Sequence, residues 1–235
     1  MAVGSVLWML QKAGSRTIME MMNTTVLRQK TSVRCVIYDC DGVLFDSLEN
    51  NRRFYNHLCA ALGRAPIRDE ELPYLHMHTV QEAVQFLFPG TPDLVKKAHE
   101  FILTVNPNDF IPYLKMEPNL LEALDALKQR GVLRAINTNR TSSMKSVLDA
   151  FSLRPYFEMV VTALDVQNPK PHPESVRRIL DAFRLRKEEA VFVGDSEIDR
   201  RTAEAADIRF IAYRNPQIAN GCLIQDHLDL LQKIA

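Results

Sequence analysis

Apolar and polar residues form alternating blocks along this chain, and four of the apolar blocks are short and rich in β-branched or aromatic residues. Such runs predict buried strands, and the longer segments between them predict helices. The expected strands are residues 33–38, 132–137, 159–163 and 190–193, and the expected helices include 174–183, 198–206 and one between Pro118 and Gly131. Strands that alternate with helices predict an α/β fold with a parallel sheet.

Two carboxylates, Asp39 and Asp41, directly follow the first expected strand, and Gly42 allows the chain to turn sharply there. In open α/β sheets, ligands bind in the crevice beyond the carboxyl ends of the strands. Both acids are therefore expected to face a ligand. Taken alone, an Asp-x-Asp-Gly segment also fits a solvated turn after a strand.

The end of the second expected strand offers an anion site. It is followed by Thr138, Asn139 and Arg140, and then by Thr141 or Ser142 as the expected cap of the next helix. A hydroxyl and free backbone amides that precede a helix bind anions well. A capping or turn role would also explain Thr138.

The third and fourth strand ends carry a lysine and two more acids. Lys170 lies between Pro169 and Pro171, which stiffen the loop and can aim the ammonium group at a fixed point. Asp195 and Asp199 follow the fourth strand, and their spacing lets both point to one place if the next helix begins early. Each acid alone would also suit a helix N-terminus.

Together these segments resemble the motifs of haloacid dehalogenase (HAD) superfamily hydrolases, in the phosphoglycolate phosphatase-like branch with a small helical cap. Each piece is a weak signal, but they occur in the family's order and at suitable spacing from residue 33 to about residue 207. The matching segments are Asp39-Cys40-Asp41-Gly42-Val43-Leu44-Phe45-Asp46-Ser47, Thr138-Asn139, Lys170-Pro171-His172-Pro173 and Gly194-Asp195-Ser196-Glu197-Ile198-Asp199. The resemblance implies a doubly wound, Rossmann-like parallel sheet with an inserted α-helical cap domain.

The resemblance also implies a phosphatase reaction in two steps. Asp39 would attack phosphorus to give an aspartyl-phosphate. Asp41 would protonate the leaving alcohol and later activate the water that cleaves the phosphoenzyme. Thr138 and the amide after it would hold phosphoryl oxygens, while Lys170 would offset negative charge. The dehalogenase and phosphonatase branches generally lack an acid at the position of Asp41, which favours phosphate ester or anhydride chemistry here.

Mg²⁺ is the cofactor that the resemblance implies. By the family pattern, its ligands are Asp39, the backbone carbonyl of Asp41 and Asp195. Asp199 is either a further ligand or an anchor for metal-bound water and Lys170. Oxygen ligands of this kind are the set that Mg²⁺ takes. Without the cation, the Asp39 anion would face a phosphate anion, so a chelator should abolish activity.

The segment between the first two motifs is expected to form the helical cap and to select the substrate. Helices are expected at residues 48–62, 79–88 and 92–105, and no convincing strand occurs between about residue 48 and residue 116. A cap that closes over the site would exclude water and complete the pocket.

Two histidines in this segment, His76 and His78, directly precede a capping-box signature at residues 79–82. The family places a specificity loop near such a turn, so His76 or His78 is expected to contact the leaving group. Arg140 is a second candidate for substrate contact, and Asn139 beside it is a third. The two histidines also fit a His-x-His metal site, although no third ligand lies nearby in the sequence.

The predicted domains are an N-terminal extension at residues 1–31, a core formed by residues 32–47 and 116–235, and a cap at residues 48–115. The apolar run in the extension is too short to span a bilayer, and no basic stretch precedes it. The extension is expected to be partly disordered or packed as a stray helix, and a transit-like segment also fits.

Composition agrees with a soluble enzyme. The chain has 235 residues, 46% of them hydrophobic, which is enough for a core and a small cap. Lys plus Arg equals Asp plus Glu at 29 each, so no net field would recruit nucleic acid or an anionic membrane. The four cysteines show no Cys-x-x-Cys spacing, which predicts reduced thiols in a cytoplasmic setting, with Cys35 and Cys40 buried near the site.

The sequence therefore predicts a Mg²⁺-dependent HAD-type phosphatase that acts on a small phosphorylated metabolite. A phosphosugar mutase would use the same nucleophile, with a sugar hydroxyl in place of water. A non-catalytic phosphate-binding module could retain the same fold, but binding alone would not require Asp41. Phosphoglycolate, a nucleotide, a sugar phosphate and pyrophosphate all fit the predicted core, and the sequence does not specify an oligomeric state.

Overall fold

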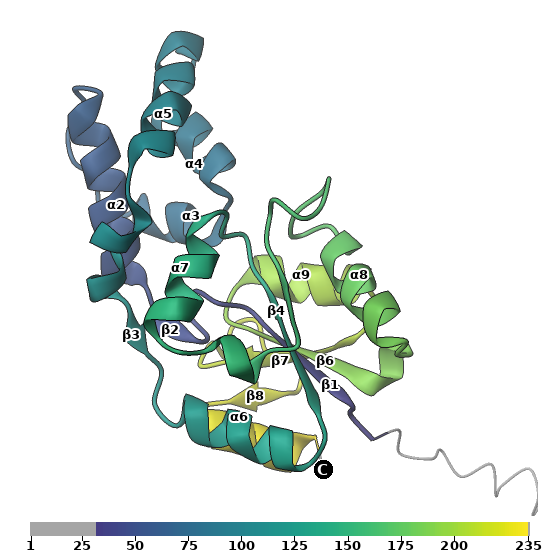
Figure 1. Cartoon of the computed structure of the whole chain (residues 1–235). Coiled ribbons are helices and arrows are strands. Elements are labelled where there is room, and N and C mark those ends of the chain that lie inside the picture. The colour runs from purple at the N-terminus through teal and green to yellow at the C-terminus, as the bar shows by residue number, and fades with distance from the viewer. Residues whose placement is uncertain (1–31, 235) are drawn as a thin grey trace, which may run out of the picture. The chain divides into compact units, whose positions relative to one another are not determined.

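Six parallel strands form the main sheet of the computed structural model, which describes residues 32–234; the predicted N-terminal extension lies outside these residues. The strands are β1 (Cys35–Tyr38), β4 (Leu133–Asn137), β5 (Met159–Val161), β6 (Ala190–Gly194), β7 (Arg209–Tyr213) and β8 (Leu223–Ile224). Their order across the sheet is β5-β4-β1-β6-β7-β8 (Figure 1). The prediction of a doubly wound α/β sheet is confirmed.

Strand β1 lies between β4 and β6 and is buried on both faces. Val36 and Tyr38 join the apolar cluster on one face of the sheet, whereas Cys35 and Ile37 join the cluster on the other. Strands that are covered on both faces have continuous apolar sequences. This is why the segment predicts a buried strand rather than an alternating, half-exposed one.

Helices cover both faces of the sheet (Figure 1). On the face of Val36, apolar side chains come from α6 (Leu120–Gln129), α7 (Ser143–Ala150) and α10 (His227–Lys233). On the face of Cys35, they come from α8 (Glu174–Phe183) and α9 (Glu197–Ala205). With both faces covered, the carboxyl ends of the strands are where polar side chains can meet a ligand.

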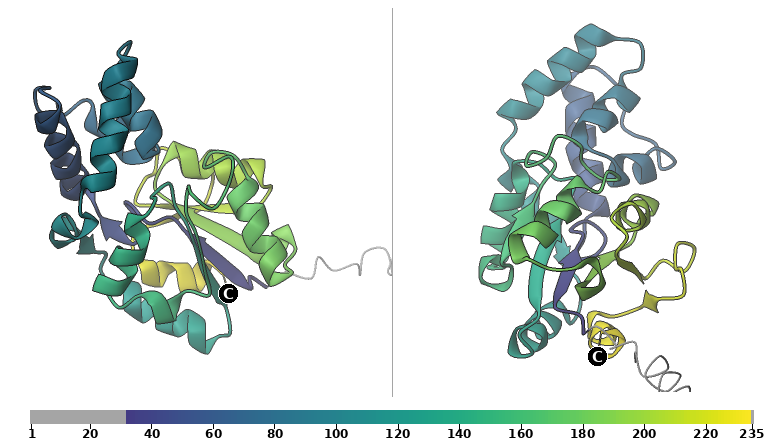
Figure 2. Two further views of the ribbon diagram at one scale, coloured as in Figure 1. Left: turned by 45° about the horizontal axis from the view of Figure 1, so that its top comes forward. Right: turned by 90° about the vertical axis from the view of Figure 1, so that its right-hand side faces the viewer.

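A helical segment, here called the insert (residues 48–113), lies between two short antiparallel strands, β2 (Phe45–Asp46) and β3 (Lys115–Met116). Its helices are α2 (Leu48–Ala61), α3 (Leu72–Met77), α4 (Val80–Leu87) and α5 (Pro92–Thr104). They share an apolar cluster of their own and stand apart from the main sheet in each view of Figures 1 and 2. Strand β3 corrects the expectation of no strand up to residue 116, because a two-residue strand has no readable periodicity.

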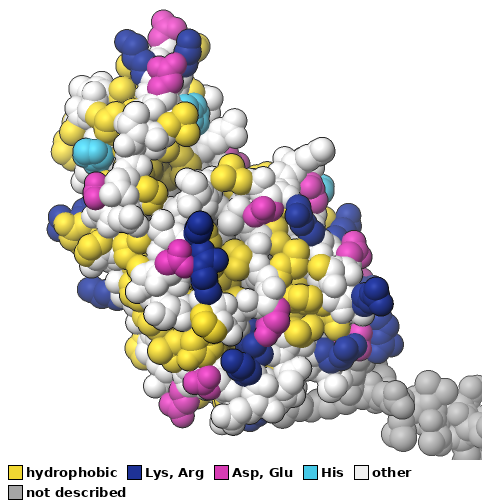
Figure 3. Space-filling model, viewed as in Figure 1, with side chains coloured by type: hydrophobic (Ala, Val, Ile, Leu, Met, Phe, Trp, Pro, Cys, Tyr) yellow, Lys and Arg dark blue, Asp and Glu magenta, His cyan; other side chains and the backbone are white. Residues whose placement is uncertain are grey.

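The surface mixes charges of both signs. On the face shown in Figure 3, basic and acidic side chains are interspersed with apolar ones. Among residues 32–234, no helix combines the length and the apolar character needed to cross a membrane. Short 3₁₀ segments complete the described elements at Pro107–Asp109, Ile111–Tyr113, Arg154–Tyr156 and Lys187–Glu189.

Candidate functional site

Asp39 lies at the carboxyl end of the central strand. Tyr38, the last residue of β1, is in register with Ile136 of β4 and Val193 of β6. The backbone N–H of Asp39 donates to the carbonyl oxygen of Val193 at 2.9 Å, which continues the ladder by one residue. Asp39 is only 7% exposed. The sheet therefore fixes this carboxylate in the middle of the strand ends, as the sequence predicts.

The turn after Asp39 is tight and needs its glycine. The N–H of Gly42 donates to the carbonyl oxygen of Phe45 at 2.8 Å, and the φ of Gly42 is 79°. A Cβ atom at this position would lie 2.0 Å from Oδ2 of Asp195. Glycine is therefore required for two reasons. Its backbone is left-handed here, and a side chain would collide with the Asp195 carboxylate.

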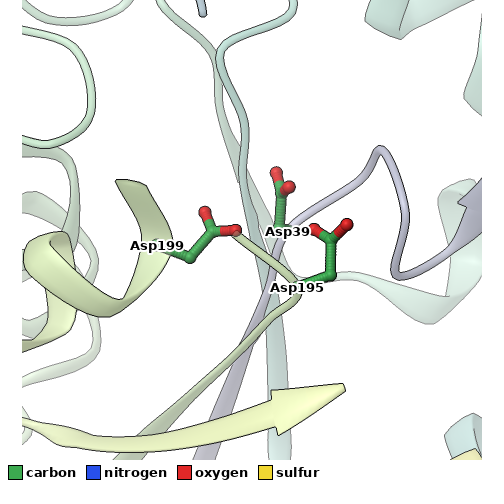
Figure 4. Close-up of side chains that lie close together, drawn as sticks. All are labelled: Asp39, Asp195 and Asp199. Carbon is green, nitrogen blue, oxygen red and sulfur yellow. The ribbon is translucent and has the colours of Figure 1, made fainter. Parts of the chain in front are cut away.

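Asp195 and Asp199 reach the same place from β6 and from the first turn of α9. Ser196 caps α9, since its Oγ accepts from the N–H of Asp199 at 3.2 Å, and Asp199 belongs to the same capping box. Carboxylate oxygens of Asp39, Asp195 and Asp199 lie within 4.8 Å of one another (Figure 4). The helix begins early enough for the two later acids to converge, as the sequence predicts.

Lys170 lies between two of these carboxylates. Its Nζ donates to Oδ1 of Asp39 at 2.7 Å and to Oδ1 of Asp199 at 2.6 Å. Burial acts to lower the pKa of Lys170, but the charges of Asp199 and Asp39 outweigh it and raise the pKa. The lysine is 4% exposed and is held as a cation.

One lysine does not balance the charge of three acids, of which Asp39 and Asp199 are buried and Asp195 is half-buried. Burial, followed by the charge of Asp199, raises the pKa of Asp39 to about 7 even though Lys170 opposes the shift. Burial and the charges of Asp199 and Asp39 also raise the pKa of Asp195 well above its usual value. The raised pKa values reflect an excess of negative charge in this cluster, and a bound cation would neutralise part of that charge.

Thr138 and Asn139 lie beside this cluster at the end of β4. Thr138 is 2% exposed, and its Oγ1 accepts from the backbone N–H of Arg140 at 3.1 Å. Nδ2 of Asn139 contacts the carbonyl oxygens of Lys170 at 3.4 Å and Met77 at 3.5 Å. Asn139 thus joins the loop of Lys170 to the insert.

The expected side-chain cap of the helix after Thr138 is absent from the structure. Ser142 occupies the N-cap position of α7, but it makes no side-chain hydrogen bond to the helix and its backbone is already helical. A side-chain cap requires an extended backbone at that position. Ser142 therefore has the predicted position at the start of the helix, but the prediction of a side-chain cap is wrong.

Arg140 pairs with Asp41 across the strand ends. Nε and Nη2 of Arg140 donate to Oδ2 and Oδ1 of Asp41, both at 2.6 Å. Burial acts to raise the pKa of Asp41, but the guanidinium outweighs it and the net shift is downward. The sequence singled out both residues but did not predict the pair, because Arg140 was expected to contact substrate directly.

The two histidines of the insert differ in their surroundings. His76, on α3, accepts a hydrogen bond at Nδ1 from Nδ2 of Asn51 at 2.7 Å. Burial lowers the pKa of His76, and the charge of Asp41 opposes this shift. His78 instead stacks on Tyr74 with ring centroids 3.8 Å apart. Within the described residues, the three-carboxylate cluster is the group with metal-ligand geometry, and neither histidine belongs to it.

Two supporting residues were not singled out from the sequence. Nδ2 of Asn215, which follows β7, donates to the carbonyl oxygen of Asp195 at 2.8 Å. Nε2 of the fully buried His227 donates to the carbonyl oxygen of Val43, in the turn after Asp39, at 2.9 Å. Asn215 was detectable, because a polar residue after an apolar strand is the signal that identified the other strand ends. His227 gives no local signal.

Comparisons with known proteins agree with this arrangement. Residues 36–213 match the family model described as haloacid dehalogenase-like hydrolase. The chain is 28% identical over 179 residues to the pyrophosphatase PpaX of Bacillus pumilus, covering 75% of this chain and 81% of that protein. It is 29% identical over 190 residues to a phosphoglycolate phosphatase of Rhodobacter capsulatus, covering 76% and 83%. The crystal structure of a HAD-superfamily hydrolase of subfamily IA from Geobacter sulfurreducens has a TM-score of 0.75 and 38% identity, covering 86% of this chain and 100% of that one.

Proposed function

This chain belongs to the haloacid dehalogenase-like hydrolase family, and we propose that it is a Mg²⁺-dependent phosphatase acting on a small phosphorylated metabolite. One fold supports several reactions, so the residues of the site must themselves support this one. The observation that carries the proposal is the position of Asp39, which is buried at the end of the central strand against Lys170 and within reach of two further carboxylates.

The donor set fits Mg²⁺. Asp39, Asp195 and Asp199 offer only oxygen atoms, and these converge within 4.8 Å. Hard oxygen ligands of this kind suit Mg²⁺ and not a soft metal. We assign Asp39, Asp195 and the backbone carbonyl of Asp41 as ligands, with Asp199 as a ligand or as the anchor of Lys170. When bound, the cation would neutralise charge on the transferred phosphoryl group and on Asp39.

In the first step, a carboxylate oxygen of Asp39 attacks phosphorus and the bond to the leaving oxygen breaks, which gives an aspartyl-phosphate. The Thr138 hydroxyl and the backbone amide of Asn139 hold the phosphoryl oxygens at the end of β4. Lys170 stays in place between Asp39 and Asp199 and stabilises the charge that builds up during transfer.

In the second step, water attacks the phosphorus of the aspartyl-phosphate and releases phosphate and free Asp39. Asp41 lies two residues from the nucleophile on the same turn, where it can protonate the leaving oxygen first and take a proton from water second. The pair with Arg140 favours the carboxylate form of Asp41, which is the form that the second step needs. For the first step, Asp41 has to take up a proton from water before it can give one to the leaving oxygen.

We propose that the insert acts as the cap. It joins the core through β2 and β3, and the end of α3 lies beside the site through the contact of Met77 with Asn139. His76 belongs to this helix and is our candidate for leaving-group contact. His78 packs on Tyr74 inside the insert and is a weaker candidate.

For the substrate, we propose a small phosphate ester or anhydride. The relatives in Bacillus pumilus and Rhodobacter capsulatus are named for pyrophosphate and for phosphoglycolate. Pyrophosphate is a small phosphate anhydride and phosphoglycolate is a small phosphate ester, so both belong to the proposed class. We also assign a cytoplasmic setting, because all four cysteines, which lie within the described residues, are free.

Phosphate release from a panel of phosphomonoesters and pyrophosphate tests the proposal. We expect release with Mg²⁺, loss of release when EDTA is in excess, and recovery when Mg²⁺ is restored, because Asp39 and phosphate otherwise repel each other. Calorimetric titration of the protein with Mg²⁺ gives an independent readout of the site. Turnover that persists in EDTA would contradict the metal assignment. With a hexose phosphate, an isomeric sugar phosphate in place of free phosphate would instead indicate a mutase.

Replacement of Gly42 by alanine is expected to lower kcat/KM by about 100-fold, because the new Cβ would displace the Asp195 carboxylate by an ångström or more. Gly63→Ala is the matched control, since Gly63 has a similar φ of 71° and no atom within 4 Å of the added Cβ. Both variants should lose similar stability from the left-handed backbone, and only Gly42→Ala should lose activity. Equal kcat/KM values for the two variants would exclude the steric role of Gly42.

A further inference from the structure

Arg140 contacts the residue that must face the leaving group. Its guanidinium holds Asp41 through two hydrogen bonds of 2.6 Å, and the side chains of Arg140 and Asp41 are 11% and 14% exposed. A general acid has to be within hydrogen-bond reach of the leaving oxygen. Two successive hydrogen bonds then place that oxygen within about 6 Å of the guanidinium.

The Arg140 guanidinium has N–H groups that donate to no acceptor in the described residues. Of its five N–H groups, Asp41 engages one on Nε and one on Nη2. Within residues 32–234, the structure gives the Arg140 side chain no other hydrogen bond, and Nη1 is not among the enclosed unpaired atoms. Nη1 is therefore accessible to solvent, and it can donate to an incoming oxygen.

Lys170, the other cation of the site, already donates hydrogen bonds to two carboxylates. Nζ of Lys170 donates to Asp39 and to Asp199 and lies on the nucleophile side of the cluster. Arg140 is thus the cation of the described site that faces the leaving-group side with unused donors. A planar fork with free N–H groups recognises a carboxylate or a phosphate better than a neutral hydroxyl.

We infer that Arg140 is an anion subsite for the leaving group, and that the preferred substrates carry a second carboxylate or phosphate next to the bridging oxygen. The inference rests on the proposed phosphatase function and narrows its substrate class. Arg140 keeps its contact with Asp41 and uses the free donors for the second anion. The same guanidinium therefore positions both Asp41 and the second anion of the substrate.

Two probes of matched size test the inference, phosphoglycolate and 2-hydroxyethyl phosphate. Their leaving groups differ only in a carboxylate against a hydroxymethyl group. We expect the wild-type protein to prefer phosphoglycolate in kcat/KM by at least about 10-fold. Arg140→Met should lower kcat/KM for phosphoglycolate by about 30- to 5,000-fold more than for 2-hydroxyethyl phosphate, the range seen when one partner of a buried ionic hydrogen bond is removed.

The ratio of the two kcat/KM values separates recognition from support of Asp41, because any loss through Asp41 affects both probes equally. Arg140→Lys, which keeps the charge but loses the fork, should retain part of the preference. Guanidinium at millimolar concentration should partly restore phosphoglycolate turnover in Arg140→Met. Arg130→Met is the control, because Arg130 is exposed and contacts the carbonyl oxygen of Leu231. It should leave both rates unchanged.

Three results would overturn the inference. The first is a wild-type protein that hydrolyses both probes equally well. The second is an equal fall for both probes in Arg140→Met and Arg140→Lys, which would leave Arg140 with a role in positioning Asp41 alone. In both cases the phosphatase function would stand. The third is a wild-type protein that releases phosphate from neither probe nor any compound of the wider panel, in which case the proposed function fails and the inference fails with it.

Discussion

Replacement of Asp39 by asparagine is expected to abolish phosphate release and to leave the protein folded. An amide of the same shape does not attack phosphorus, so no aspartyl-phosphate forms and both steps of the reaction are lost. Removal of a catalytic nucleophile costs on the order of 10⁴-fold or more in kcat. The measurement is phosphate release with Mg²⁺ on the best substrate of the panel, together with detection of an acid-stable or trapped phosphoenzyme in the wild-type protein alone.

Unfolding measurements provide the control for Asp39→Asn. Burial and the charge of Asp199 raise the pKa of Asp39 to about 7 in the folded protein. A carboxyl group with a raised pKa destabilises the folded state as pH rises from its unfolded pKa to its folded pKa. Neutral asparagine removes this cost, and Lys170 keeps Asp199 as a partner at 2.6 Å. At pH 8 with EDTA, the variant should unfold at the same or a higher denaturant concentration than wild type. Full activity in a folded Asp39→Asn protein would refute the nucleophile assignment.

The strand ends were predictable from sequence because each signal is local. A continuous apolar run followed by polar residues marks the end of a buried strand, and parallel strands bring such ends to one edge. This is how Asp39, Thr138, Lys170, Asp195 and Asp199 could be assigned to one site before the fold was known. The helix at residues 174–183 was also predicted with its observed bounds.

Contacts between distant segments could not be predicted in the same way. Arg140 and Asp41 are 99 positions apart, and nothing near either residue indicates the other. The helix α3 is six residues long, too short for a periodic pattern, so His76 was read as part of a loop before α4. The pair of Arg140 with Asp41 required the structure, and so did the placement of His76 on α3, one residue before the Met77 that contacts Asn139.

Replacement of Lys170 by methionine is expected to destabilise the protein and to reduce activity by about 1,000-fold, the effect of removing one strong electrostatic contact to the reacting group. Methionine matches the length of lysine but leaves Asp39 and Asp199, both almost fully buried, without their shared cation. Removal of one partner from a buried ion pair costs about 3–5 kcal/mol. Denaturant unfolding in EDTA measures the loss, and millimolar Mg²⁺ should recover part of it, because a divalent cation among the acids compensates the missing charge.

Lys187→Met is the matched control for this variant. Lys187 pairs with Asp207 on the surface, where the two side chains are 49% and 77% exposed, and solvent screens such pairs. Lys187→Met should therefore change neither the unfolding midpoint nor kcat. Both substitutions remove a lysine that is paired with aspartate, so a difference between the two variants in stability or kcat measures the effect of burial. If Lys170→Met kept wild-type stability in EDTA, the three acids would have to share protons instead of relying on the lysine. Retained activity in that variant would also remove Lys170 from the phosphoryl-transfer step.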